Sequence, residues 1–232
     1  MEEVKQFFDE IYTTKGKNLP FSWQWSNYIE ILYLKRLAGE YKINGLVLDA
    51  GCGVGLKMEH LKHYKVIGFD YSFEGLKVAK ELKFPLVQSS IHKIPFKDNV
   101  FDFVYSFQVI QHLPTWDYIE LSFSEISRVL KRNGVFITIN YRLGGRLEER
   151  YYPIKENEKV VLHRWAFTKE DYEMLAKKNS LKLIRYGTIL NFKPRLIGRF
   201  PSLKPVLAYL DYIMFKFNYK KGLYLVGVFK KV

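Results

Sequence analysis

Residues 46–55 read LVLDAGCGVG and constrain the fold more than any other part of the chain. Three apolar residues end in an acid, Asp49, and glycine then occupies every second position. This pattern predicts a buried strand that turns sharply into a helix beginning near Leu56. Glycines let a ligand lie against bare backbone, and a helix N-terminus offers unpaired N–H groups. The segment therefore predicts a site for a nucleotide-like cofactor.

A second strand is predicted at residues 65–70, and it also closes on an acid, Asp70. An acid about 20 residues after the first one is the expected acceptor for ribose hydroxyl groups in a nucleoside site. Tyr71 follows at once and could lay its ring against an adenine. The turn has the spacing G-x-G-x-G, with Leu56 in place of the third glycine of a pyrophosphate-binding turn. This spacing argues against a nicotinamide dinucleotide.

Three more segments follow in order, QSSIHKIPF at 88–96, FDFVYS at 101–106 and LKRNGVFI at 130–137. With the two strands they resemble the motifs of the class I S-adenosylmethionine (SAM) dependent methyltransferases of the small-molecule type, over about residues 46–140. Ser90 departs from the family, because many members carry an aspartate there. The resemblance implies an α/β fold, a Rossmann-like seven-stranded sheet with helices on both faces and an antiparallel last strand.

The resemblance also implies the cofactor, S-adenosyl-L-methionine, with S-adenosyl-L-homocysteine as its product. Asp49 would organise the methionine end, Gly51 and Gly53 would leave room for it, and Asp70 would hold the ribose. Cys52 is read as a small residue that fits the turn. The implied cofactor-binding residues are Asp49, Gly51, Cys52, Gly53, Asp70, Tyr71, Ser90, Ile91, Ser106 and Phe107.

The length of 232 residues suits one methyltransferase domain, 1–232. Within it we expect N-terminal lid helices in 1–44, a cofactor-binding core in 45–140, and substrate-side insertions in 141–167 and 191–219. Residues 141–164 have no clean period. Expected strands are 46–49, 66–70, 85–88, 101–106, 134–140, 181–189 and 222–229. Expected helices are 4–12, 25–41, 56–63, 73–83, 115–131, one beginning at Thr168 and one near 203–217.

Methyl transfer from a sulfonium is an in-line displacement, so the protein mainly supplies proximity, orientation and exclusion of water. His112 is the first candidate for a general base, because it follows the fourth strand and histidine titrates in the useful range. Its structural alternative is a histidine bonded to backbone at a helix start. No ligand spacing predicts a metal. The candidate substrate-side residues are Tyr12, Trp23, Gln108, Tyr141, His163 and Arg164.

The net charge of +13 is uneven along the chain. Residues 181–232 hold 11 basic residues and one acid, Asp211. Apolar residues at helical spacing in 203–217 have basic flanks, which suits a membrane interface as well as packing on the domain or on a twin subunit. A single cysteine, an acidic N-terminus and the lack of a long apolar run predict a cytoplasmic protein, with peripheral membrane contact left open.

Three functions fit these features. The first is transfer of a methyl group to a small-molecule or lipid-like acceptor. The second is methylation of RNA, since 161–167 is faintly similar to a segment of the wobble-uridine carboxymethyl ester methyltransferases and the basic C-terminal part could follow phosphates. The third is a SAM-binding partner protein without catalysis. Salt-sensitive binding to tRNA would favour the second, and binding to anionic vesicles the first.

Overall fold

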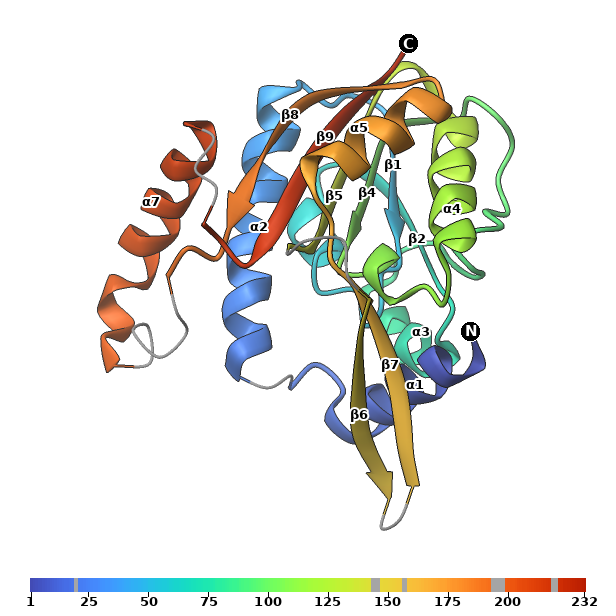
Figure 1. The fold of residues 1–232 in the computed structure, drawn as a ribbon, viewed down its shortest axis with the longest axis vertical. Coiled ribbons are helices and arrows are strands. Elements are labelled where there is room, and N and C mark those ends of the chain that lie inside the picture. Colours follow the sequence, from blue (N-terminus) through green and yellow to red (C-terminus); the bar gives the residue numbers. More distant parts are fainter. Residues whose placement is uncertain (19–20, 143–146, 156–157, 193–198, 218–220) are drawn as a thin grey trace.

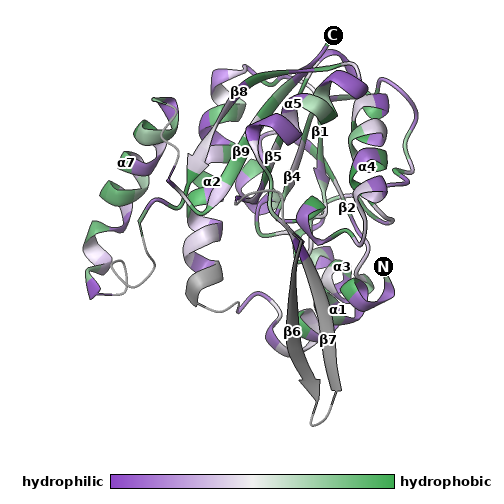
Figure 2. Ribbon diagram, in the orientation of Figure 1, coloured by the Kyte–Doolittle hydropathy of each residue, from purple (hydrophilic) through white to green (hydrophobic). Residues whose placement is uncertain are grey.

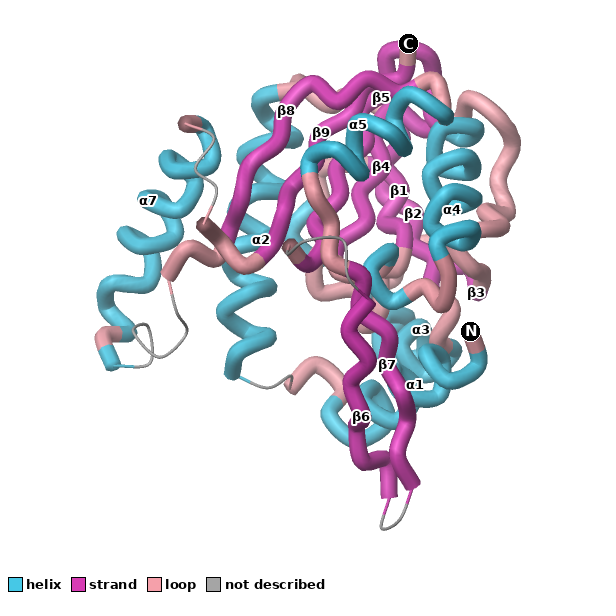
Figure 3. Tube along the Cα trace, in the orientation of Figure 1, coloured by secondary structure: helices cyan, strands magenta, loops and turns pink. Residues whose placement is uncertain are grey.

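The computed structural model describes the backbone of residues 1–18, 21–142, 147–155, 158–192, 199–217 and 221–232, and their side chains except at 21–23, 147–155 and 158–163. Its main sheet has seven strands in the order β3-β2-β1-β4-β5-β9-β8 (Figures 1 and 3). The strands are β1 (Leu46–Ala50), β2 (Lys65–Asp70), β3 (Leu86–Gln88), β4 (Phe101–Phe107), β5 (Leu130–Tyr141), β8 (Leu181–Ile189) and β9 (Tyr224–Lys231).

Strands β1 to β5 run parallel to one another, whereas β9 lies antiparallel between β5 and β8. This arrangement confirms the predicted fold class. Parallel strands bring their carboxyl ends to one edge of the sheet, which is where ligands bind in open α/β sheets. Asp70 ends β2 at that edge, and the glycine turn follows β1 there.

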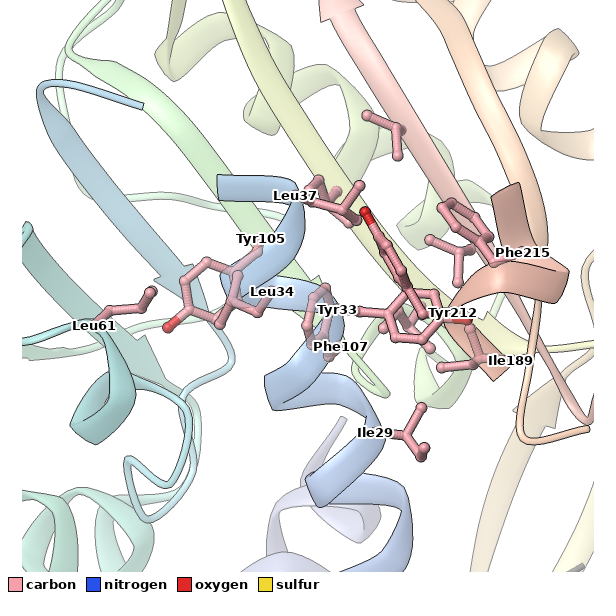
Figure 4. Packing of buried hydrophobic residues seen from close by; sticks show 14 of the residues in the cluster. Ile29, Tyr33, Leu34, Leu37, Leu61, Tyr105, Phe107, Ile189, Tyr212 and Phe215 are labelled. Atoms are coloured by element: carbon pink, nitrogen blue, oxygen red, sulfur yellow. The ribbon is translucent and has the colours of Figure 1, made fainter. Parts of the chain in front are cut away.

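Helices cover both faces of the sheet because successive strand residues point to opposite sides. Val47 joins one apolar cluster, with α2 (Phe21–Glu40) and α7 (Lys204–Lys216), whereas Leu48 joins the other, with α4 (Trp116–Val129) and α5 (Lys169–Lys178). Figure 4 shows Tyr33 of α2 against Tyr212 and Phe215 of α7. Helix α2 is thus packed between the sheet and α7.

Two helices lie beyond the carboxyl ends of the parallel strands. They are α1 (Glu2–Lys15) and α3 (Phe73–Ala79), which contact one another. A separate hairpin of β6 (Leu147–Lys155) and β7 (Glu158–Trp165) projects past α1 (Figure 1). Of the two segments expected as substrate-side insertions, this hairpin lies beside α1, whereas α7 packs on α2 and β8 at the edge of the sheet.

One local expectation was wrong. The helix expected at 56–63 is a single 3-10 turn, η1 (Met58–Leu61), because the turn with its positive-φ glycines extends to Gly55 and the chain must turn again before β2 begins at Lys65. Residues 141–164, which showed no period, hold the hairpin. A two-stranded ribbon outside the main sheet need not cover an apolar core, so its sequence need not alternate between apolar and polar residues.

The remaining 3-10 turns are η2 (Lys80–Leu82), η3 (Ile110–His112) and η4 (Pro201–Leu203). Thr168 caps α5 as expected: its hydroxyl accepts from the Asp171 N–H, and the Asp171 carboxylate accepts from the Thr168 N–H. In the described part of the chain, no helix combines the length and apolarity that crossing a membrane would require.

Candidate active site

The glycine turn after β1 is held against the end of β2. The N–H groups of Gly51 and Cys52 both donate to the carbonyl of Phe69, each at 2.9 Å. Gly51 has φ +90°, and a Cβ there would come within 2.3 Å of the Val109 side chain. The turn therefore requires glycine at position 51 both for its backbone conformation and for the close approach.

Asp70 ends β2 and faces this turn. Its Oδ2 accepts from the Gly53 N–H at 2.7 Å, and its Oδ1 accepts from the Ser72 N–H at 2.8 Å. A carboxylate has about four acceptor positions, so each oxygen keeps one for a hydroxyl donor. Burial raises the pKa of Asp70 to about 6, and the two N–H donors limit the rise.

Asp49 lies beneath the turn rather than in the pocket. The Tyr105 hydroxyl donates to its Oδ2 at 2.8 Å, and the side chain is buried among β1 and β4. Burial raises the pKa of Asp49 to about 7. The carboxylates of Asp49 and Asp70 also repel one another, which adds to the rise. Both groups favour a cationic ligand above them, because a positive charge would stabilise their ionised forms.

A cavity of about 230 Å³ opens above the turn. Twelve of the predicted site residues with described side chains line it, and three do not: Asp49 and Ser106 are buried in the strands, and Tyr141 lies behind Arg164. The side chains of Trp23 and His163 lie outside the described residues. The predicted residues that line the cavity are Tyr12, Gly51, Cys52, Gly53, Asp70, Tyr71, Ser90, Ile91, Phe107, Gln108, His112 and Arg164.

Helix α1 lies over this cavity. The Asp9 carboxylate accepts from the Ser72 hydroxyl at 2.5 Å, and Glu2 accepts from the Tyr71 hydroxyl at 2.8 Å. The Tyr12 hydroxyl packs directly on Gly53, because a Cβ built there would lie 2.5 Å from it. These contacts tie the predicted lid to the ends of β1 and β2. The cavity is smaller than the roughly 300 Å³ of common ligand pockets, since α1 side chains project into it.

On the far side of the cavity, a chain of polar side chains runs from α2 to η3. Lys57 pairs with Glu30 at 3.0 Å, Glu30 accepts from the Gln108 amide at 2.7 Å, and Gln108 accepts from the Gln111 amide at 3.0 Å. Sequence analysis missed Glu30, Lys57 and Gln111. The sequence offered one signal for these residues, because Glu30 is an acid among the apolar residues of α2. In the structure Glu30 is 1% exposed.

His112 ends this chain. The Gln111 Oε1 accepts from the Tyr141 N–H at 2.5 Å, so the amide nitrogen of Gln111 must face His112 Nε2, which accepts from it at 3.1 Å. Neutral His112 then carries its proton on Nδ1. The ring also meets Phe8 of α1 edge-on at 5.6 Å. For Nε2 to act as a base, the Gln111 amide would have to leave it, so that the acceptor substrate could donate a hydrogen bond to Nε2 instead.

The hairpin brings a cation to the same cavity. The guanidinium carbon of Arg164 lies 3.8 Å from the centre of the Tyr141 ring, a close cation–π contact. The Trp165 indole N–H donates to the Leu113 carbonyl at 2.7 Å, which joins β7 to the loop that follows His112. The predicted substrate-side residues Tyr141 and Arg164 therefore contact one another, from β5 and β7.

The donor set fits a sulfonium nucleoside better than a metal or a pyrophosphate. Gly51 leaves its backbone bare, Asp70 at the cavity wall keeps acceptor positions for hydroxyls, and the buried carboxyl of Asp49 lies below the turn. Within the described residues there is no cluster of His, Cys, Asp and Glu that could hold a metal ion. The sequence of residues 48–138 matches a family of methyltransferase domains.

Residues 48–138 therefore make up a methyltransferase domain, and the protein is a SAM-dependent methyltransferase. Its cofactor is S-adenosyl-L-methionine. The family match covers less than half of the chain, and it includes the glycine turn, Asp70 and His112.

Relatives of this methyltransferase differ in how much of the chain they share. An uncharacterised protein of Methanocaldococcus jannaschii is 28% identical over 97% of both chains. A sterol 24-C-methyltransferase of Gibberella zeae is 37% identical over 103 residues, which are 39% of this chain and 26% of that enzyme. A SAM-dependent methyltransferase of Thermotoga maritima has the same fold, with a TM-score of 0.69 at 16% identity, over 98% of this chain and 100% of that one.

The raised pKa values predict how binding depends on pH. Both carboxyls have folded-state pKa values above 3.8, so the folded, ligand-free protein binds their protons more tightly than the unfolded chain does. The stability that this gives is present below about pH 4 and is lost as the pH rises to about 7. Cationic SAM favours the ionised carboxylates. We therefore expect SAM binding at pH 6.5 to release about half a proton or more.

Calorimetry in phosphate and in Tris measures this release, because the two buffers differ in ionisation enthalpy. Asp49→Asn should release fewer protons, since the amide cannot ionise while it can still accept from Tyr105. Equal binding heats in the two buffers would contradict the assignment.

Proposed function

We propose that this methyltransferase transfers the methyl group of SAM to a small-molecule or lipid-like acceptor that carries an anionic group. The observation that carries the proposal is Arg164, a half-buried cation that β7 brings to the wall of the cavity that His112 also lines. A guanidinium at the wall of a cavity recognises carboxylate or phosphate oxygens by paired hydrogen bonds. In this proposal SAM is bound by the predicted cofactor-binding residues that line the cavity above the glycine turn.

The apolar part of the wall supports an acceptor with hydrocarbon or ring surface. Val4, Phe7 and Phe8 of α1 and Leu113 after η3 all line the cavity. Such a wall holds an apolar body, while a few polar groups fix its orientation. The local similarity to a sterol methyltransferase points to the same class of acceptor. Helix α1 covers the cavity, which suits an enclosed small acceptor better than a nucleotide within an RNA chain.

In this proposal the chain's own residues position the reactants. Asp70 holds ribose hydroxyls, the glycine turn lies against the methionine half, and α1 excludes water when it covers the cavity. The protein need not activate the methyl group, because the sulfonium already does so. Orientation and desolvation then account for most of the rate enhancement.

Methyl-labelled SAM incubated with the protein and with fractionated lipid, small-metabolite and RNA extracts tests the acceptor class. We expect label in the lipid or small-metabolite fraction, and less label with Arg164→Gln. Label in the RNA fraction would contradict the proposal and support the tRNA alternative. SAM binding without transfer to any fraction would support a non-catalytic SAM-binding protein.

His112→Ala tests the proposed base. We expect kcat to fall about a hundredfold, the usual contribution of a positioned proton acceptor, with little change in SAM affinity. Steady-state kinetics with the labelled acceptor separates the two parameters. His112→Asn is the matched variant, since it keeps a polar group at the site but cannot take a proton at neutral pH. A change confined to the acceptor KM would show that the residue orients the acceptor and is not a base.

A further inference from the structure

Large apolar side chains gather on the outer surface of α7. Of the twelve that the described residues leave exposed, six lie between residues 200 and 217. Figure 2 shows hydrophobic residues along α7, at the flank of the molecule. We call these six side chains the outer face: Phe200, Leu203, Val206, Tyr209, Leu210 and Phe217.

The outer face is not needed to hold α7 on the domain. The opposite side of the helix does this, because Leu207, Tyr212 and Phe215 are buried against α2 and β8. Asp211 is buried there too, and its carboxylate accepts from the Tyr33 hydroxyl and from the Asn191 N–H. Helix α7 is therefore apolar on both sides, and only one side is buried within the described chain. A patch of this kind marks an interaction surface.

Cations border the outer face. Arg199 and Lys216 are exposed on the same segment, and the Arg36 guanidinium of α2 lies over the Tyr209 ring at 5.7 Å. Lys204 instead lies over the Tyr28 ring of α2, at 4.1 Å. The one acid between residues 199 and 217, Asp211, is buried, so it does not offset these charges at the surface. The segment thus presents bulky apolar groups in the middle and positive charge around them.

We infer that the outer face of α7 docks the protein on an anionic lipid bilayer. A helix with an apolar face and lysine or arginine beside it lies in the plane of the membrane interface, with its apolar side chains among the acyl chains and its cations among anionic headgroups. Thirteen residues give α7 a length of about 20 Å, which is too short to cross a bilayer and suits a position along its surface.

Charge and shape favour a bilayer over the other partners. A second copy of the chain, docked face to face by a twofold axis, would bring two sets of cations together, and Asp211, the one acid of residues 199–217, is buried and cannot pair with them. RNA could contact the cations and stack on the aromatic members of the face, but Leu203, Val206 and Leu210 are aliphatic and would stay exposed to water, whereas acyl chains take up all six side chains. Anionic lipid is complementary to both parts of the face.

Docking at α7 would keep the cavity close to the membrane. Helix α2 packs on α7 through Tyr33, and the same helix contributes Ser26, Asn27 and Glu30 to the cavity wall. Only one helix therefore separates the docking face from the cavity. Binding to vesicles requires neither SAM nor an acceptor, so the inference stands apart from the proposed function.

Vesicle co-sedimentation of the full chain tests the inference, with phosphatidylcholine alone and with added phosphatidylglycerol. We expect binding to the mixed vesicles, much weaker binding to phosphatidylcholine alone, and a partition coefficient about tenfold lower for Leu210→Glu, because one large apolar side chain no longer enters the bilayer. Lys216→Gln should weaken binding to the mixed vesicles about fivefold. Leu121→Glu is the matched control, because Leu121 is 50% exposed on α4 and Leu210 is 44% exposed.

The inference would be overturned if the wild-type protein did not bind the mixed vesicles. It would also be overturned if Leu210→Glu bound them as tightly as the wild type does. Sedimentation velocity and tRNA retention test the other occupants. A dimer that Leu210→Glu converts to a monomer, or tRNA retention that this variant abolishes, would assign the face to a second copy or to RNA. Circular dichroism and SAM titration confirm that each variant is folded, so a failure of SAM binding is separated from a failure of docking.

Discussion

Asp70→Ala is expected to weaken SAM binding at least about a hundredfold, because two hydrogen bonds to a charged carboxylate are together worth about 3 kcal/mol or more. The substitution also removes the acceptor for the Gly53 and Ser72 N–H groups, so the glycine turn loses its tie to β2. Titration calorimetry with SAM measures the change.

Asp102→Ala provides a control for the loss of a carboxylate near the sheet. Asp102 likewise accepts a backbone N–H, from Leu46 at 2.9 Å, but it lies at the amino ends of β1 and β4. We expect this variant to bind SAM as the wild type does. If Asp70→Ala bound SAM with unchanged affinity, the ribose would have to be held elsewhere.

Glu30→Ala is expected to lower the free energy of unfolding by about 3–5 kcal/mol, the usual result of breaking a buried ion pair. Glu30 is 1% exposed and the Lys57 side chain 16%, so Lys57 would keep its charge in a mostly buried position with only the neutral Asn27 amide oxygen as a hydrogen-bond acceptor. The Gln108 amide would lose its acceptor at the same time. Urea unfolding followed by fluorescence measures the difference.

The Glu30→Met, Lys57→Met double variant separates loss of the pair from loss of one partner. It should recover much of the stability, because neither charge is then left unpaired. Glu173→Ala removes an exposed partner of Lys169 on α5 and should change stability by about 0.5 kcal/mol or less. A double variant as unstable as Glu30→Ala would mean that Glu30 acts through contacts other than Lys57.

The part of the site that was predictable from sequence is the part built by short segments. The glycine turn and Asp70 lie at the ends of adjacent parallel strands, and parallel pairing brings such ends together whatever the rest of the chain does. Glu30, Lys57 and Gln111 could not be placed, because α2, η1 and η3 meet only in the tertiary structure. A buried ion pair has no spacing along the chain that would reveal it.

The fold was predicted for a related reason. Strands of the main sheet carry long apolar runs, since both faces of the sheet are covered, and these runs stand out in the sequence. The hairpin of β6 and β7 lies outside that sheet, so the same signal is missing. The outer face of α7 was visible as a helical apolar pattern, but the pattern could not separate the side packed on α2 from the exposed side.

Calorimetric titration of the wild-type protein with SAM and with NAD⁺ tests the central claim most directly, since the claim is that the turn at residues 51–55 and Asp70 hold a sulfonium nucleoside. The account predicts uptake of one SAM per chain and no measurable heat from NAD⁺. Binding of NAD⁺ in place of SAM, or no uptake of SAM, would contradict it.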